Sequence, residues 1–356
     1  MGYNDAGFSP DGTNIVSASA DGTVKVWSVA TGECVQTLKG HTDVVISAGF
    51  SPDSPDGTKI VSASADNTVR VWDTKTWGCL QTLEGHSGSV FSAEFNPDGT
   101  NIVSASGDGH MKVWSVATGG CEQTLQERSN YTVFSAGFNS DGTNIVSASG
   151  DGTVRVWSVA TGGCEQTLKG HRGYVFSAGF SPGDTNIVSA GGDNTVRVWS
   201  VATGECEQTL KGHSDTVFSA GFNRDGTKIV SASADNTVRV WSVATWECLQ
   251  TLEGHSGTVF SAGFSPDGTK IVSASRDGHM KVWSVATGEC VQTLGGGQSG
   301  GYSRRKTSRR KTSRRKSSRR KTSRRKSSRR KTSRRKSKMN RRKRKLKNKT
   351  RGRRSR

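Results

Sequence analysis

Short runs of β-branched, aromatic and small residues alternate with turn residues along most of the chain. In residues 212–252 the runs TVFSAGF, TKIVSAS, TVRVWS and ECLQTL occupy 216–222, 227–233, 237–242 and 247–252. The first three runs are separated by NRDG and ADN, and Asn, Asp and Gly tolerate the backbone angles of tight turns. The pattern therefore predicts four short strands joined by turns.

The same unit recurs with a period of about 42 residues. Each unit has a tryptophan in its third strand, at Trp27, Trp72, Trp114, Trp157, Trp199, Trp241 and Trp283. One four-stranded unit cannot bury both of its faces, whereas units stacked around a ring cover one another and leave only short edges. We therefore predict an all-β fold, a seven-bladed β-propeller of four-stranded antiparallel blades over residues 1–294. The blades are expected at about 1–39, 40–84, 85–126, 127–169, 170–211, 212–253 and 254–294.

Five units share a Gly-His pair at their start, an Asp in the second turn and the third-strand Trp. These residues are His41, Asp66 and Trp72; His86, Asp108 and Trp114; His171, Asp193 and Trp199; His213, Asp235 and Trp241; and His255, Asp277 and Trp283. The spacing resembles that of the WD-repeat β-propeller family, and the resemblance covers about four-fifths of the chain. It implies a structural tetrad in each blade, made of the His, a second-strand Ser (Ser231 or Ser233 in the sixth unit), the Asp and the Trp indole.

Ser, His and Asp together also fit a hydrolase, but a catalytic triad needs one exposed nucleophile beside an oxyanion hole. Five copies at equivalent positions favour a brace, so we predict no enzyme activity, no cofactor and no metal site. Units 1 and 4 lack the His, and their braces should be incomplete. Every blade uses consecutive strands, so closure should depend on side-chain packing between blades 1 and 7, which we expect to be the weakest junction.

Each unit also has one cysteine at the start of its fourth strand: Cys34, Cys79, Cys121, Cys164, Cys206, Cys248 and Cys290. Equivalent positions of different blades should lie too far apart for a disulfide, so we expect small, buried thiols in a reducing compartment. A Lys or Arg stands two residues before every third-strand Trp, and its recurrence indicates an architectural role. These residues are Lys25, Arg70, Lys112, Arg155, Arg197, Arg239 and Lys281.

Positions where the units differ are candidates for binding. On the face with the fourth-to-first and second-to-third loops, we expect the platform for protein partners to include Arg128, Tyr131, Arg172, Tyr174 and Arg276. Aromatic and Arg side chains are common interface hot spots. The alternative explanation of these differences is neutral drift among the repeats. On the opposite face Trp77 and Trp246 replace Gly in the third-to-fourth turn, and each should either bind a partner or fold back.

The charge of the chain divides into two opposite parts. Residues 302–356 hold 33 of the 51 Lys and Arg and no Asp or Glu, so 18 basic and all 30 acidic residues remain in 1–301, a net charge of −12. Residues 295–301 read as a Gly-rich linker, and 303–337 as seven copies of SRRKT or SRRKS. Such composition predicts a disordered basic tail over 302–356 that binds polyanions such as DNA, RNA or chromatin.

Within the tail, RRKRKLK resembles a nuclear-localisation cluster, with Arg341, Arg342, Lys343, Arg344, Lys345 and Lys347 as its basic residues. The Ser and Thr of the RRKS and RRKT motifs resemble phosphorylation sites. We expect an intracellular protein, in the nucleus rather than the cytoplasm, with no transmembrane segment, monomeric on its own. Its function would be that of a non-catalytic protein-interaction scaffold. The alternatives are a cytoplasmic scaffold in signalling or transport complexes whose tail contacts anionic membrane or cytoskeleton, and a tail that is a functionless low-complexity expansion.

Overall fold

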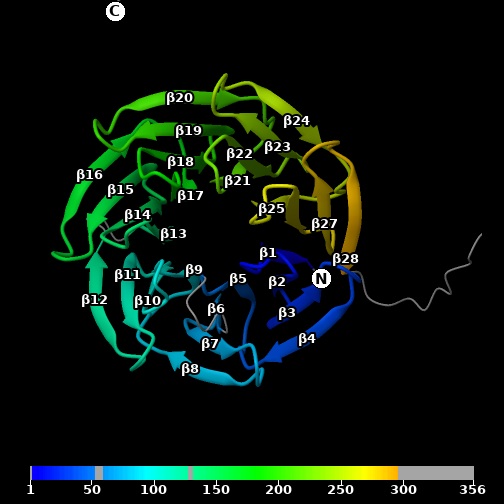
Figure 1. Ribbon diagram of the computed structural model, residues 1–356. Helices are drawn as coiled ribbons and strands as arrows, with labels where there is room; N and C mark the ends of the chain where they lie inside the picture. Colours follow the sequence, from blue (N-terminus) through cyan, green and yellow to red (C-terminus); the bar gives the residue numbers. More distant parts are fainter. Residues whose placement is uncertain (1, 53–58, 127–130, 296–356) are drawn as a thin grey trace, which may run out of the picture. The chain divides into compact units, whose positions relative to one another are not determined.

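The chain forms a ring of seven four-stranded antiparallel sheets around a central channel (Figure 1), as the repeat predicted. The computed structural model describes residues 2–52, 59–126 and 131–295. Every sheet consists of four strands that follow one another in the sequence, so the strand order within each blade is simply one to four. The part of the chain that the structure describes contains no helix long and apolar enough to cross a membrane.

The strands occupy equivalent positions in the seven blades. The innermost strands are β1 (Tyr3–Phe8), β5 (Val45–Phe50), β9 (Val90–Phe95), β13 (Val133–Phe138), β17 (Val175–Phe180), β21 (Val217–Phe222) and β25 (Val259–Phe264). The second strands are β2 (Asn14–Ser19), β6 (Lys59–Ser64), β10 (Asn101–Ser106), β14 (Asn144–Ser149), β18 (Asn186–Gly191), β22 (Lys228–Ser233) and β26 (Lys270–Ser275). The third strands are β3 (Thr23–Ser28), β7 (Val69–Asp73), β11 (His110–Ser115), β15 (Thr153–Ser158), β19 (Thr195–Ser200), β23 (Val238–Ser242) and β27 (His279–Ser284). The outermost strands are β4 (Cys34–Lys39), β8 (Cys79–Leu83), β12 (Cys121–Gln126), β16 (Cys164–Lys169), β20 (Cys206–Lys211), β24 (Cys248–Leu252) and β28 (Cys290–Gly295).

The hydrophobic core lies between blades rather than within them. Between blades 6 and 7, Val230, Val240 and Leu252 of one blade pack against Ile271 and Trp283 of the next. The junction of blades 7 and 1 contains a cluster of the same kind, with Val272 and Leu294 against Ile15 and Trp27. Burying apolar side chains between sheets is the main force that holds stacked repeats together.

A circle of hydrogen bonds around the channel adds a polar link at every junction. In each case the third residue of an innermost strand (Ser, or Asp5 in blade 1) accepts a hydrogen bond from the amide of an Ala in the next blade. Acceptors and donors are Asp5 and Ala48, Ser47 and Ala93, Ser92 and Ala136, Ser135 and Ala178, Ser177 and Ala220, Ser219 and Ala262, and Ser261 and Ala6, at 3.0–3.3 Å. The junction of blades 7 and 1 is therefore closed by polar contacts as well as by packing.

The expectation that the cysteines are buried is wrong, because all seven are exposed and unpaired. Each begins an outermost strand, and in the sixth blade only Leu252 of β24 is buried. The free edge of this strand faces outward, so no neighbouring sheet covers the thiols.

The two tryptophans of the third-to-fourth turns fold back onto the ring. Trp77 and Trp246 have φ angles of 60° and 62°, a region that a bulky side chain rarely adopts and that Gly32 and Gly204 occupy at equivalent turns. Each indole is partly buried and packs against the hydrophobic cluster of a blade junction, Trp77 against that of blades 1 and 2 and Trp246 against that of blades 5 and 6. Packing of the indole offsets the backbone strain at both positions.

Candidate functional site

In the blades that have the Gly-His pair, one hydrogen-bonded chain crosses the blade. In blade 6, Nδ1 of His213 lies 2.8 Å from the Asp235 carboxylate and Nε2 lies 2.8 Å from the Ser231 hydroxyl. The Trp241 indole donates to the same hydroxyl at 2.9 Å. A carboxylate only accepts, so Nδ1 carries the proton and Nε2 accepts from Ser231. Ser231 rather than Ser233 is the serine of this set.

The geometry is nearly the same in the other four such blades. His–Asp distances are 2.8–3.0 Å, His–Ser distances 2.7–2.8 Å and Trp–Ser distances 2.8–2.9 Å for the sets His41, Asp66, Ser62 and Trp72; His86, Asp108, Ser104 and Trp114; His171, Asp193, Ser189 and Trp199; and His255, Asp277, Ser273 and Trp283. All five serines are buried. Five buried copies have the character of a brace, in which each polar group gives its neighbour a partner.

Electrostatics hold the brace in one protonation state. Burial lowers the pKa of His213, although Asp235 partly opposes the change. Burial works against ionisation of Asp235, but hydrogen bonds from Thr237 and His213 outweigh it and lower the pKa of this carboxyl. At neutral pH the pair is therefore a neutral imidazole beside a carboxylate.

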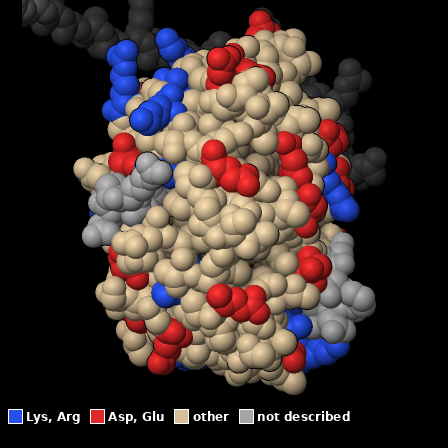
Figure 2. Space-filling view, turned by 90° about the vertical axis from the view of Figure 1, so that its left-hand side faces the viewer, with Lys and Arg blue, Asp and Glu red and all other residues tan. Residues whose placement is uncertain are grey.

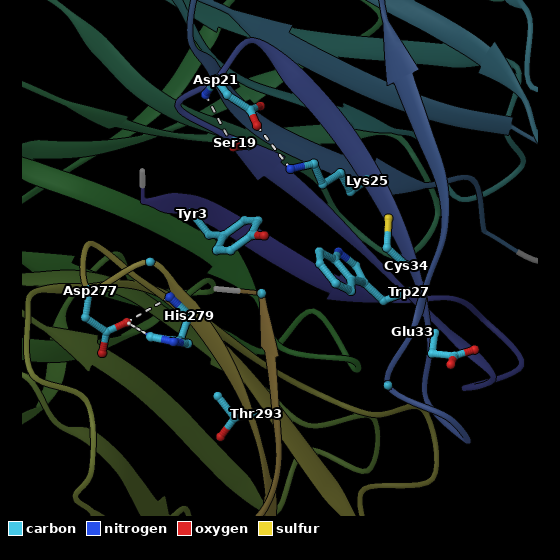
Figure 3. A pocket seen from close by; sticks show the side chains of 13 residues that line it. Tyr3, Ser19, Asp21, Lys25, Trp27, Glu33, Cys34, Asp277, His279 and Thr293 are labelled. Carbon is cyan, nitrogen blue, oxygen red and sulfur yellow. Dashed lines mark hydrogen bonds and ion pairs between the residues drawn. The ribbon is translucent and has the colours of Figure 1, made fainter. Parts of the chain in front are cut away.

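Blade 1 lacks the histidine, and Tyr3 occupies part of its place (Figure 3). The Tyr3 ring packs edge-on against Trp27 at 6.0 Å, much as His213 packs against Trp241 at 6.2 Å. The Trp27 indole still donates to Ser17 at 2.9 Å, while Lys25 pairs with Asp21 at 3.0 Å. Three members of the brace (Ser17, Asp21 and Trp27) are thus kept, and Tyr3 and Lys25 contact them in place of the missing histidine.

Beside Tyr3 lies a cavity of about 920 Å³ between blades 7 and 1. In blade 6 the glycine of the Gly-His pair, Gly212, packs directly on the Trp241 ring. In Figure 3 the cavity is bordered by Tyr3 and Trp27 of blade 1 and by Asp277 and His279 of blade 7. It marks the place where a Gly-His segment covers the tryptophan in other blades.

Blade 4 also lacks the histidine, but part of its loop, including the predicted binding residue Arg128, lies outside the described residues. Trp157 donates to Ser147 at 2.9 Å, and Arg155 pairs with Asp151 at 2.6 Å.

The predicted partner platform contains two exposed tyrosines. Tyr131 and Tyr174 have exposed fractions of 51% and 57%, and Arg172 is exposed beside Tyr174. The Tyr174 ring lies 6.0 Å from Phe134 of blade 4 and 6.2 Å from Phe176 of its own blade. Blades 4 and 5 are thus joined at this rim.

Arg276 is exposed but belongs to blade 7 and lies beside Gly2, so it is not part of this group.

A belt of aromatic rings, which the sequence did not predict, lies at the end of the ring where Tyr174 is found. The second residues of five successive innermost strands are half-buried phenylalanines whose neighbouring centroids lie 4.9–5.3 Å apart: Phe91, Phe134, Phe176, Phe218 and Phe260. Blades 1 and 2 have Asn4 and Ile46 at this position. The signal was present in the recurring VFSAGF, but the strand pattern alone did not show that the rings would meet across blades.

On the side of the ring that Figure 2 shows, acidic side chains do not gather into one site. Figure 2 shows Asp and Glu spread over the side that includes β12 and β16, with most of the visible surface formed by uncharged residues. Glu94, by contrast, lies on the innermost strand β9, at a position where the other blades have Gly. Glu94 is exposed at its surface, yet desolvation among the inner strands and, to a lesser extent, the charge of Asp5 raise the pKa of Glu94 to about 7.

A closed ring of seven blades, braced inside by His, Ser, Asp and Trp, defines a β-propeller of the class built from WD repeats. Family comparison agrees: residues 3–182 match the family described as the IFT122 first beta-propeller. Residues 204–242 and 246–284 match the WD domain, G-beta repeat. The chain belongs to the WD-repeat β-propeller family, whose members typically act as non-catalytic scaffolds for other proteins.

Two curated relatives match the chain over about the length of one repeat each. The chain is 54% identical over 37 residues to nuclear distribution protein PAC1-2 of Uncinocarpus reesii, a match that covers 10% of this chain and 8% of that protein. It is 46% identical over 48 residues to nuclear distribution protein PAC1 of Coccidioides posadasii, covering 14% and 10%. The chain thus spans about a tenth of the length of the curated relatives it matches.

Proposed function

We propose that the protein is a non-catalytic scaffold whose propeller (1–294) binds a protein partner through the rim of blades 4 and 5. The linker 295–301 separates this domain from a basic tail (302–356) that binds polyanions. The observation that carries the first part is the pair of exposed rings, Tyr131 and Tyr174, on neighbouring blades. An exposed tyrosine offers a large rigid surface with a polar end, which suits it to interfaces.

Alanine variants test this rim. Changing Tyr131, Arg172 and Tyr174 together to Ala should remove partners from an affinity purification of the tagged full chain. Their exposure means that the thermal unfolding temperature should stay close to that of the parent chain. A matched control changes Leu80, Leu249 and Val291, which are exposed on outermost strands away from the rim, to Ala. An unchanged set of captured proteins in the rim variant would rule out this platform.

For the tail we propose binding to nucleic acid or chromatin in the nucleus. Its 33 positive charges favour polyanions through release of counterions, so affinity should fall steeply with salt and depend little on sequence. Phosphorylation of the RRKS and RRKT motifs would weaken the binding by cancelling charge. Deleting 302–356 should abolish binding of a DNA duplex in a mobility-shift assay, and unchanged binding by 1–301 would refute this part.

A second candidate is a scaffold in the cytoplasm whose tail meets anionic membrane or cytoskeleton, since the same charge attracts those surfaces too. Microscopy of the tagged chain with and without 302–356 separates the two. Nuclear signal that is lost with the tail supports the first candidate, and filament or membrane signal supports the second. Localisation unchanged by the deletion, together with no loss of polyanion binding, would identify the tail as a functionless expansion.

A further inference from the structure

On the outer rim of the propeller, three of the exposed cysteine thiols contact an arginine of the adjacent third strand. In each pair the guanidinium Nη1 lies within hydrogen-bonding reach of the cysteine Sγ. The pairs are Arg70 and Cys79 at 3.7 Å, Arg197 and Cys206 at 3.6 Å, and Arg239 and Cys248 at 3.7 Å. The three sites occupy blades 2, 5 and 6 and repeat the same geometry.

The blade itself fixes each of these guanidinium groups. The Arg239 guanidinium lies 6.0 Å from the centre of the Trp241 ring, and the corresponding distances in blades 2 and 5 are 6.0 and 5.9 Å. The third and fourth strands pair Trp241 with Cys248, which sets the thiol beside the stacked arginine. Stacking on an aromatic face is favourable for a guanidinium and keeps it in place.

These same three arginines also lack a full set of acceptors. Among the described residues, the buried Nε–H groups of Arg70, Arg197 and Arg239 have no hydrogen-bond partner. Each guanidinium therefore has one unused donor and is held against an exposed sulfur, and Arg197 also lies 4.0 Å from the Asp193 carboxylate. A negative charge or an added acceptor at that sulfur would improve its surroundings.

Other blades provide the comparison within the same chain. Blades 1, 3 and 7 have a lysine at the arginine position, and the three ammonium groups are directed to oxygen atoms rather than to sulfur. Lys25 pairs with Asp21 at 3.0 Å, Lys112 donates to Thr124 at 3.1 Å and Lys281 donates to Thr293 at 3.4 Å. All seven thiols share two further contacts. Each Sγ donates to the carbonyl of the residue two positions later, at 3.3 or 3.4 Å. Each Sγ also lies 3.7–3.9 Å from the hydroxyl of the Thr three positions later.

We propose that Cys79, Cys206 and Cys248 are sites of thiol modification by an anionic low-molecular-weight disulfide of the glutathione type. The thiolate is the nucleophile in thiol–disulfide exchange, and the adjacent guanidinium attracts the carboxylates of the approaching disulfide. The thiolate attacks one sulfur of the disulfide after its proton has left to solvent. A protein–glutathione S–S bond forms, the original S–S bond breaks, and the departing glutathione thiolate takes the electron pair. The carboxylates of the attached glutathione then lie near the positive charge of the guanidinium, whose Nη1 faces the sulfur.

The seven thiols of one full-length chain can be compared in a single experiment. The reduced protein is treated with oxidised glutathione, and separately with the neutral reagent iodoacetamide, and the extent of reaction at each cysteine is followed by peptide mass spectrometry. Cys206 and Cys34 make a matched pair, since VWSVATGECEQTLK and VWSVATGECVQTLK differ at one residue. Cys79, Cys206 and Cys248 should react at least about threefold faster than Cys34, Cys121 and Cys290 with oxidised glutathione, because the guanidinium attracts its carboxylates, and the difference should be smaller with the neutral iodoacetamide.

Exchanging the basic residues tests the cause without changing the charge. Arg239→Lys should slow Cys248 to the rate of Cys290 and leave Cys79 unaffected, while Lys281→Arg should raise the rate of Cys290. Lysine and arginine both occur naturally at this position, so the propeller tolerates either. Rates within threefold of one another for all six cysteines, or a Cys248 rate unchanged in a normally folded Arg239→Lys variant, would overturn the proposal. The reciprocal Lys281→Arg variant decides the matter if Arg239→Lys fails to fold.

Discussion

Replacing His213 by alanine should destabilise the propeller by removing the centre of one brace. The substitution deletes the hydrogen bond to the Asp235 carboxylate at 2.8 Å and the one to Ser231 at 2.8 Å. It also leaves the edge of Trp241 uncovered. Asp235 keeps its hydrogen bonds from Thr237 and from the amide of Ser214, so the carboxylate does not become isolated.

The size of the effect follows from these contacts. A neutral hydrogen bond contributes about 1 kcal/mol and one to a charged group about 1.5–3 kcal/mol. Water that enters the vacated space restores part of this. We therefore expect a loss of about 2–3 kcal/mol in the free energy of unfolding. That is a large fraction of the stability of an ordinary domain.

Urea denaturation of the full chain, followed by tryptophan fluorescence, measures the loss, and hydrogen exchange shows whether it is confined to blade 6 and its neighbours. His279→Ala is the matched control, because the His279 side chain is 43% exposed and lies 3.5 Å from its nearest carboxylate oxygen. It should cost less than about 0.5 kcal/mol. A His213→Ala loss below about 1 kcal/mol, or no greater than that of the control, would refute the brace.

The same brace predicts a dependence on pH. Burial lowers the pKa of His213 in the folded state below its ordinary value of 6.5, so the unfolded chain binds more protons near that pH. The stability contributed by this group is complete above pH 6.5 and is lost as the pH falls toward the folded pKa. His213→Ala should therefore fall less steeply in stability below pH 6.5 than the parent chain. Parallel curves would contradict this assignment.

Two further substitutions and one comparison between blades test other parts of the ring. Ser219→Ala removes the acceptor of the Ala262 amide and should cost about 0.5–1.5 kcal/mol with faster exchange of that amide; unaltered exchange would show that the bond contributes nothing. Glu94→Gln should raise the thermal unfolding temperature at pH 8 but not at pH 4. The pKa of Glu94 is raised to about 7, so the stability that this carboxyl contributes is present below pH 4.5 and is lost as the pH rises through 7. Equal unfolding temperatures of the variant and the parent chain at pH 8 would contradict this effect. Amides of blade 1 should exchange faster than those of blade 4, and stronger protection in blade 1 would contradict a weak junction.

The architecture could be predicted from the sequence because the evidence for it is repeated seven times. The spacing of the tryptophans gave the number of blades, and the Gly-His pairs, Asp and Trp pointed to side chains that the structure brings within 3.0 Å of their partners. The sequence also narrowed the serine of the brace in the sixth blade to Ser231 or Ser233, because alternate residues of a strand share a face.

What escaped prediction depends on contacts between blades. The Ser219 hydroxyl looked like one more polar strand residue, because the amide that it accepts from is 43 positions away. Tyr3 was not foreseen in the place of a histidine, since it comes from the start of a strand rather than from a Gly-His loop. The exposure of Cys248 was misjudged because a cysteine is more often buried, and the pattern along one strand does not reveal which of its edges remains open.

The circle of hydrogen bonds around the channel has one sense of rotation, with every acceptor preceding its donor by a single blade. Every blade therefore presents a side-chain oxygen to its successor (a Ser hydroxyl in six blades, the Asp5 carboxylate in blade 1) and an Ala amide to its predecessor, so the modules are interchangeable. Gaining or losing a whole repeat by gene duplication or deletion would leave no inner amide without an acceptor. For the same reason, a circularly permuted chain cut between two other blades should reassemble the identical circle.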